Sequence, residues 1–269
     1  MLRSATLAVA ATLAVGAGLF GAAPSDPAPA TITRSAAQTS ARVSVGQLIE
    51  QVPHRDLVGE VAAATTGSRT VSTLRGSSSA YRFLAVDNGK PAHWNRCRTI
   101  RYRVNPSGIP SGALADVKEA VRRLSAASGL RFSYAGTTTV VPYSNSRWSR
   151  IPSGQAADIF LAFSTAAKVS GLRGSVAGMG GPLYQRTSRE PRIVLGGVVI
   201  DRATSLHPGF AAGASRGTLL LHELGHAINL GHVSDGYQVM YPSLSSRSRG
   251  DYQRGDRAGL TKLRSYGCF

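Results

Sequence analysis

Hydrophobic and polar positions change their spacing along the chain in a way that predicts alternating strands and helices from residue 80 onwards. Over 99–104 every second residue is hydrophobic, which is typical of a strand with one buried face. Helical spacing follows over 113–130, and 131–135 predicts another strand. Because the order is strand, helix, strand, we expect the two strands to be parallel with a right-handed crossover.

The same patterns predict further elements downstream. The nearly continuous apolar run at 158–163 is typical of a central strand covered on both faces. The glycine-rich segment 171–181 is consistent with a loop or an edge strand. Ser215 is a typical N-cap for a helix with an apolar ridge. Other expected elements are a strand at 81–86 followed by a turn at 87–89, a strand at 192–200 and a last helix at 254–264.

The N-terminus has the pattern of an export signal. Arg3 precedes a run of apolar and small residues from Ala5 to Phe20. Ala28-Pro29-Ala30 has the small-residue pattern of a cleavage site, with Gly21-Ala22-Ala23 as a nearer alternative that a proline follows. We therefore expect residues 1–30 to be a signal peptide and the protein to be secreted. An uncleaved membrane anchor is the alternative, but the run is shorter than the roughly 20 residues that span a bilayer.

The composition of the chain changes at about Ala80. Residues 31 to about 80 are rich in small and polar residues with little periodicity, and we expect 31–92 to be a propeptide or linker region, partly disordered. Its residues 45–52 have helical spacing, which is consistent with a short amphipathic helix; disorder or a wall-spanning tether are the alternatives. Residues 93–269 are enough for one hydrophobic core, and we expect one domain and a monomer.

Charge and cysteine usage add expectations about partners and compartment. The formal net charge is +17, so a secreted form is expected to be attracted to anionic cell-surface polymers, unless the charges are simply spread over solvated faces. No nucleic-acid-binding module is recognisable, and we expect no specific nucleic-acid partner. Cys97 and Cys268 are the only cysteines and lie near the two ends of the predicted domain, which predicts one disulfide in an oxidising compartment.

The clearest chemistry lies in the predicted helix after Ser215. Residues four apart share a helix face, so His222 and His226 can direct two imidazoles at one metal ion. Glu223 is rotated by about 100° from His222, which places a carboxylate beside the ion, where a base for a water molecule belongs. The alternative is a helix with core histidines, but such a polar cluster is costly to bury without a metal.

A third ligand requires a turn after this helix. His232 lies ten residues after His222 and would point elsewhere in a continuous helix. Asn229 and Gly231 supply the turn, because Asn and Gly most readily adopt the left-handed conformation that ends a helix. The sequence therefore predicts a zinc site of three histidines.

These residues resemble a known family. The run from His222 to His232, with Met240-Tyr241-Pro242 downstream, resembles the metzincin signature H-E-x-x-H-x-x-G-x-x-H with its Met-turn, and it is most similar to the matrixin branch, the matrix metalloproteinases. The resemblance implies an α/β catalytic domain over about 93–269. Its expected fold is a twisted, mostly parallel five-stranded sheet, two long helices and a C-terminal helix.

The resemblance also assigns roles to individual residues. It implies a zinc-dependent endopeptidase acting on protein or peptide substrates, with one catalytic zinc ion on His222, His226 and His232. Glu223 would be the general base for the attacking water. Met240 would form a hydrophobic floor beneath the histidines, and the segment starting with Tyr241 and Pro242 would form a wall of the substrate pocket.

Three departures from the family pattern matter. Asn229 replaces the usual glycine, and the turn is expected to survive because Asn tolerates the same backbone region. The stretch 196–201 has apolar residues where matrixins hold structural zinc and calcium, so we expect no structural zinc; Asp201 alone is a weak calcium candidate. Matrixins are kept latent by a propeptide cysteine on the zinc, but the sequence around Cys97 lacks that motif, so the disulfide is the favoured reading.

A second class of function shares the same ligands. A secreted zinc-binding adhesion or wall-associated module could keep the metzincin fold without turnover. The presence of Glu223 favours the peptidase.

Overall fold

The computed structural model describes residues 74–144 and 151–269. The expected signal peptide at 1–30 and the stretch with helical spacing at 45–52 lie outside the described residues. No helix among the described residues is long and apolar enough to cross a membrane.

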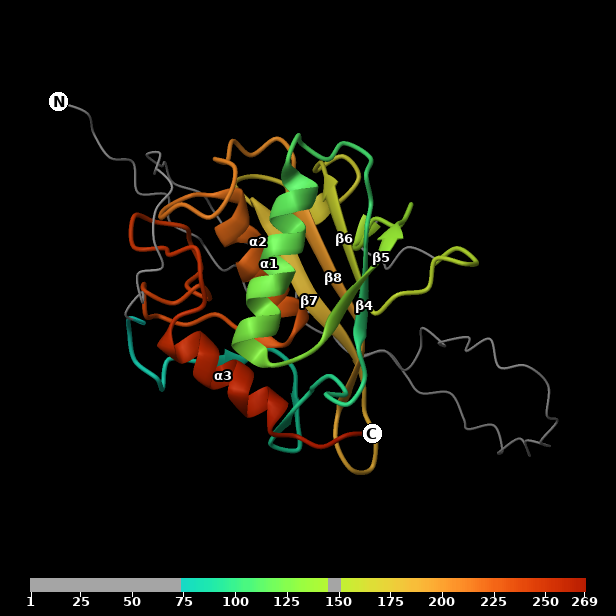
Figure 1. Cartoon of the computed structure of the whole chain (residues 1–269), viewed down its shortest axis with the longest axis vertical. Coiled ribbons are helices and arrows are strands. Elements are labelled where there is room, and N and C mark those ends of the chain that lie inside the picture. Colours follow the sequence, from blue (N-terminus) through green and yellow to red (C-terminus); the bar gives the residue numbers. More distant parts are fainter. Residues whose placement is uncertain (1–73, 145–150) are drawn as a thin grey trace, which may run out of the picture.

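A twisted five-stranded sheet organises this part of the chain (Figure 1). Its strands, in spatial order, are β5 (Phe132–Thr137), β4 (Ile100–Val104), β6 (Ile159–Ser164), β8 (Arg192–Asp201) and β7 (Gly178–Gln185). The first four are parallel, and β7 runs antiparallel to β8 at the edge. The mostly parallel sheet and the parallel β4–β5 pair are therefore confirmed, and the glycine-rich segment 171–181 leads into the edge strand and includes its first residues, 178–181.

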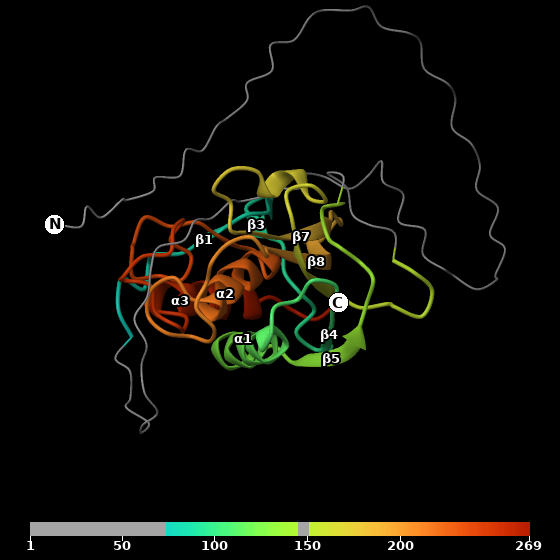
Figure 2. The ribbon, with the colours of Figure 1, turned by 90° about the horizontal axis from the view of Figure 1, so that it is seen from above.

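Three helices lie on one side of this sheet (Figures 1 and 2). They are α1 (Ala113–Ser128), α2 (Arg216–Ala227) and α3 (Arg254–Arg264). Helix α2 packs against β7, β8 and α1, and all its residues are buried. The main hydrophobic core therefore forms around α2, which is the helix that carries the HExxH motif.

A smaller apolar cluster covers the opposite face of the sheet. Val198 belongs to the main core and Val199 to the smaller cluster, as expected because successive residues of a strand face opposite sides. A short 3₁₀ helix, η3 (Ser170–Leu172), contributes to this second layer. Its buried members are Tyr143, Val169, Leu172, Val176, Met179 and Val199. Both faces of the central strands are thus covered.

Two short strand pairs lie outside the five-stranded sheet. A hairpin joins β2 (Val86–Asp87) to β3 (Lys90–Pro91), with Asn88 and Gly89 at φ 47° and 72° in the turn. Positive φ at both central residues is the reason why Asn-Gly is favoured there. Upstream, β1 (Arg82–Phe83) pairs with β9 (Leu230–Gly231), directly after α2. The described residues 74–92, which the sequence places in a linker region, are therefore packed on the folded body.

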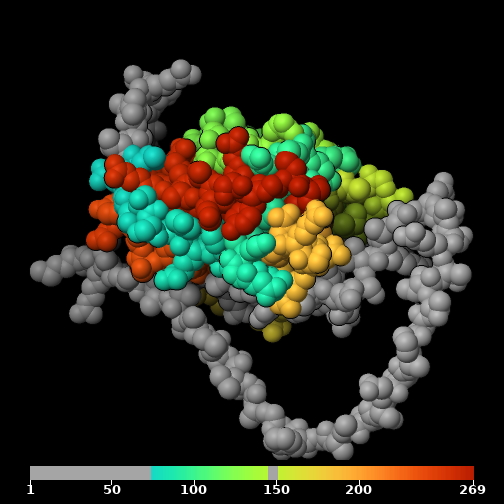
Figure 3. Space-filling view, turned by 90° about the horizontal axis from the view of Figure 1, so that it is seen from below, coloured from blue at the N-terminus to red at the C-terminus, as the bar shows by residue number. Residues whose placement is uncertain are grey.

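A disulfide joins the two ends of the region 93–269. Cys97 and Cys268 form a disulfide with a Cα–Cα distance of 5.6 Å. The Asn95 amide also donates to the carbonyl of Phe269. Figure 3 shows the C-terminal segment, in red, lying against the described N-terminal segment, in cyan. The C-terminus is therefore fixed beside the start of the domain.

Breaking the disulfide should lower stability markedly. Its cysteines are 171 residues apart, and closing so long a loop restricts the unfolded chain, which typically stabilises the folded state by about 2–5 kcal/mol. We expect Cys97→Ser with Cys268→Ser to lower the free energy of unfolding by this amount, which urea unfolding shows as a lower midpoint. The double variant should not respond to reductant, whereas equal midpoints for reduced and oxidised native protein would contradict the prediction.

Candidate metal centre

Helix α2 begins at a well-formed cap. The Ser215 hydroxyl accepts a hydrogen bond from the backbone N–H of Thr218, as expected of an N-cap. The helix continues through the apolar residues Leu220 and Leu224 to Ala227, all fully buried. Because apolar packing holds the helix on its other faces, the motif face is fixed relative to the sheet.

The turn after α2 is made by one residue. Asn229 has φ 89° and lies in the left-handed region. Gly231, which the sequence also suggested for the turn, does not have positive φ and instead lies in β9. The chain therefore reverses at Asn229, and β9 leads directly to His232.

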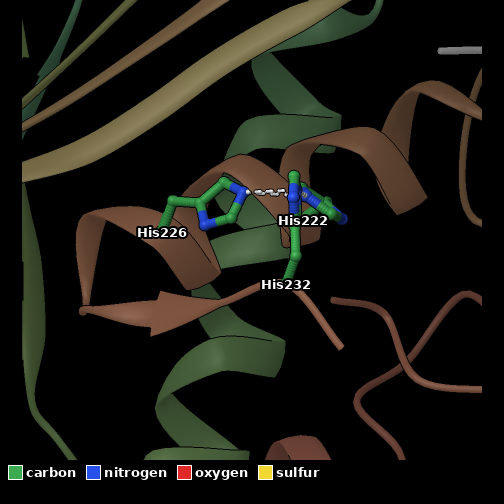
Figure 4. Close-up of side chains that lie close together, drawn as sticks. All are labelled: His222, His226 and His232. Atoms are coloured by element: carbon green, nitrogen blue, oxygen red, sulfur yellow. Dashed lines mark hydrogen bonds between the residues drawn. The ribbon is translucent and has the colours of Figure 1, made fainter. Parts of the chain in front are cut away.

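The three histidines converge on one point (Figure 4). The Nε2 atoms of His222 and His226 are 2.9 Å apart, and the Nε2 atom of His232 is 3.2 Å from each of them. A tetrahedral zinc ion with bonds of about 2.05 Å would place its nitrogen ligands roughly 3.3 Å apart. The spacing of these nitrogens is therefore close to that of a zinc site.

Backbone carbonyls fix which nitrogen faces the centre. The Nδ1 atom of His222 lies 2.6 Å from the carbonyl oxygen of Val239, and that of His226 lies 2.8 Å from the carbonyl oxygen of Leu230. A carbonyl only accepts, so Nδ1 is the protonated donor and Nε2 holds the lone pair. Lone pairs converging from two rings repel each other unless a cation lies between them, so the donor set fits a metal ion. Among the described residues, no other group of three His, Cys, Asp or Glu side chains forms such a cluster.

Glu223 is fully buried beside the edge strand β7. A Cβ atom added at Gly178 would lie 2.6 Å from its Oε1 atom, so the absence of a side chain there makes room for the carboxylate. Tyr143 lies nearby and donates to the carbonyls of Gly181 and Gly197 at 3.1 and 3.3 Å. Burial, followed by the charge of Glu223, raises the pKa of Tyr143, which therefore remains a neutral hydroxyl.

Gly180 sets the distance between β7 and α2. A Cβ atom added there would overlap the backbone carbonyl of Glu223, and a helix backbone cannot move aside as a flexible side chain can. We expect Gly180→Ala to cost about 1–3 kcal/mol, as typical overpacking does. Urea unfolding should show the loss. Gly267→Ala, at a position with nothing within 4 Å, is the control and should leave the midpoint unchanged; equal midpoints for both variants would contradict this account of the packing.

Met240 lies directly beneath α2. It is buried, and a Cβ atom added at Gly225, between the two helical histidines, would overlap its sulfur. The two residues that follow, Tyr241 and Pro242, are half-buried. Their role as a pocket wall stays a prediction.

Asp256 holds the Met-turn and was not apparent from the sequence. Its carboxylate accepts from the backbone N–H groups of Val239 at 2.8 Å and Met240 at 3.2 Å, and it also caps α3 through Gln253. Burial raises the pKa of Asp256 to about 6, against the lowering effect of these hydrogen bonds. The Gln-x-x-Asp spacing at the start of α3 could have indicated the cap but not the second set of bonds.

Asp201 ends β8 and is only half-buried. Its Oδ1 atom accepts from the backbone N–H of Ala203 at 3.0 Å. This contact ties the carboxylate to its own turn.

Comparisons with known proteins place this arrangement in a family. Residues 93–266 match the sequence profile of the matrixins. No match was found among curated protein sequences.

Two solved structures show a distant likeness. One is high choriolytic enzyme 1, a hatching enzyme zinc-protease from Oryzias latipes (medaka fish), with 14% identity and a TM-score of 0.29 over 56% of this chain and 55% of that one. The other is metalloproteinase-II from Bacteroides fragilis, with 15% identity and a TM-score of 0.37 over 65% of this chain and 55% of that one. This chain thus spans about half the length of either structure, and neither likeness carries an argument by itself. The profile match covers more than half of the chain and includes the histidine motif and the Met-turn, and the chain therefore belongs to the matrixin family of zinc metallopeptidases.

Proposed function

We propose that this protein is a secreted zinc-dependent endopeptidase. The observation that carries the proposal is the convergence of the Nε2 atoms of His222, His226 and His232 within 3.2 Å of one another, next to a buried carboxylate on the adjacent helical position. Matrixin membership supports the reaction class. Secretion is supported by the sequence pattern of residues 1–30.

The residues of the site have separate roles in the proposed reaction. The three histidines hold the metal, and the carbonyls behind His222 and His226 fix their rings. Zinc, when bound, supplies Lewis acidity toward a substrate carbonyl and makes water a nucleophile near neutral pH. Glu223 takes the proton of the attacking water and returns it to the departing amine. This role requires a carboxylate close to the metal but not on it, and it is supported by Glu223, which is buried, adjoins His222 on α2 and is not one of the three clustered ligands.

The edge strand β7 is the surface on which we propose that the substrate binds. It ends the five-stranded sheet, and its glycines bring it against Glu223. An edge strand presents unpaired backbone groups, to which an extended peptide can add as a further strand. Such pairing would bring a peptide bond of the substrate to the metal while placing few demands on its side chains.

Activity against a general protein substrate tests this proposal. The purified full chain should cleave casein or gelatin, lose that activity with a zinc chelator, and regain it when zinc is restored. A zinc-binding module without turnover would bind the metal and leave both substrates intact in all three conditions. That result would contradict the peptidase proposal and favour a zinc-binding adhesion or wall-associated module.

The net charge of +17 supports a second, weaker part of the proposal, namely attraction to anionic cell-surface polymers. Sedimentation with anionic and with neutral lipid vesicles tests it. Binding should be confined to the anionic vesicles and should weaken with salt. Equal binding to both kinds of vesicle would remove this part without affecting the peptidase.

A further inference from the structure

Asn229, at the turn between two metal ligands, is held by three side-chain hydrogen bonds. Its Oδ1 atom accepts from the N–H of Ala85 at 2.7 Å, and its Nδ2 group donates to the carbonyls of Ala85 at 2.9 Å and Ala92 at 2.7 Å. The side chain is fully buried. The backbone N–H of Leu84 also donates to the carbonyl of Asn229 at 3.2 Å. The turn is thereby tied to a segment about 140 residues earlier in the chain.

The chain just after Asn229 is tied to the same segment. In the β1–β9 pair, Arg82 lies opposite Gly231 and Phe83 opposite Leu230. Leu230 is also the residue whose carbonyl accepts from Nδ1 of His226. His232 follows β9 directly. Residues 82–92 therefore border the backbone that orients one metal ligand and delivers another.

The turn itself does not require an amide side chain. At φ 89° glycine is unstrained, whereas asparagine lies in a region that non-glycine residues seldom occupy. A residue held in such a conformation needs compensation from its surroundings. Here the compensation is the set of hydrogen bonds to Ala85 and Ala92. We call these bonds the tether: the side chain is needed to hold residues 82–92 to the turn, and not to form the turn itself.

We propose that Asn229 is a positioning residue of the metal centre, and that it acts by tying the segment 82–92 to the turn that places His226 and His232. The proposal rests on the zinc site of the proposed function. The segment 82–92 precedes the matrixin match at 93 and carries no metal ligand, yet it becomes part of what holds zinc in place. Without the tether all three histidines are still present, but their nitrogens spend less time in the converged geometry that binds zinc. Zinc affinity is therefore lower.

Asn229→Gly tests the tether because it keeps the backbone conformation and removes only the amide. We expect its zinc affinity, measured by competition with a chromogenic chelator, to fall at least tenfold. Asn88→Gly is the matched control: Asn88 has φ 47° at the exposed tip of the β2–β3 hairpin and is not one of the residues that bond Asn229, so the same exchange there should leave zinc affinity unchanged. A merely structural role would lower the unfolding midpoint of the zinc-free variant with little change in zinc affinity, and a folded Asn229→Gly protein within twofold of the native affinity would overturn the proposal.

Hydrogen exchange on the native chain provides a test that needs no variant. Energetic coupling between two sites is reciprocal. If the tether raises zinc affinity, zinc binding should in turn slow hydrogen exchange at the amides of the tether. We expect chelation to speed exchange at the amides of Leu84 and Ala85, which donate to Asn229, much more than at Tyr102 in β4. Unchanged exchange at Leu84 and Ala85 would overturn the proposal. If the native chain binds zinc but cleaves no peptide, the peptidase proposal fails while both of these measurements still decide the tether.

Discussion

Replacing Glu223 with glutamine should lower the rate of peptide cleavage by about 10²–10⁴ while zinc and fold are retained. Glutamine is nearly the same size and a good helix former, so it fits the space that the absence of a side chain at Gly178 leaves. It cannot accept and return a proton as a carboxylate does. The loss should therefore fall on turnover and leave zinc content and the unfolding midpoint close to native values.

Glu119→Gln is the matched control for this variant. Glu119 lies on α1, and its hydrogen bonds with Arg122 and Arg123 lower its pKa to about 2. Losing this partly exposed carboxylate should have little effect on cleavage. A zinc-loaded, folded Glu223→Gln protein with near-native cleavage would show that Glu223 is not the base. Loss of activity only together with zinc and stability would assign it a structural role.

Replacing His226 with alanine should abolish stoichiometric zinc binding. Its Nε2 atom is one of three converging donors, and two imidazoles cannot form the three-ligand site on which catalytic zinc depends. Loss of an outer partner of a metal ligand typically weakens binding by 10–100-fold, and loss of the ligand itself should exceed that. A ligand present at a hundred times its Kd stabilises a fold by about 2.7 kcal/mol, so the variant should also lose the zinc-dependent rise in unfolding midpoint.

His207→Ala is the control for this prediction. His207 is exposed and lies in the loop before α2, outside the histidine cluster. It should keep one zinc per molecule and the zinc-dependent rise in midpoint. Elemental analysis that finds one zinc per molecule in the His226→Ala protein would contradict the ligand assignment.

The fold was predictable where local spacing determines structure. Alternation over 99–104, the helical stripe over 113–130 and the apolar run at 158–163 each gave an element within two residues of its observed ends. The Asn88-Gly89 turn followed from the positive φ that such a turn needs. The same logic placed the reversal at Asn229 but also assigned Gly231 to it, because a glycine in a short strand has no distinct sequence signal.

The supports of the site could not be read from the sequence. The bonds from Asn229 to Ala85 and Ala92 join segments more than 130 residues apart, and their partners are backbone atoms that any residue would offer. Tyr143 lies in a segment without periodicity, so nothing predicted its burial beside Glu223. Asp256 has the spacing of a helix cap, and its second set of bonds depends on how α3 meets the Met-turn. Local sequence patterns therefore predicted the metal ligands, whereas the contacts that hold those ligands in place arise from long-range packing that the sequence does not show.

Zinc titration of the chelator-stripped full chain, with cleavage of an unbiased peptide library followed by mass spectrometry, tests the central claim most directly. Three ligands that converge on one point predict one productive ion per molecule. Cleavage should be absent without metal, rise in proportion to added zinc and saturate at one equivalent. Cleavage that persists in the stripped protein, or a protein that takes up one equivalent of zinc and cleaves no peptide in the library, would contradict the assignment of this site as a zinc peptidase centre.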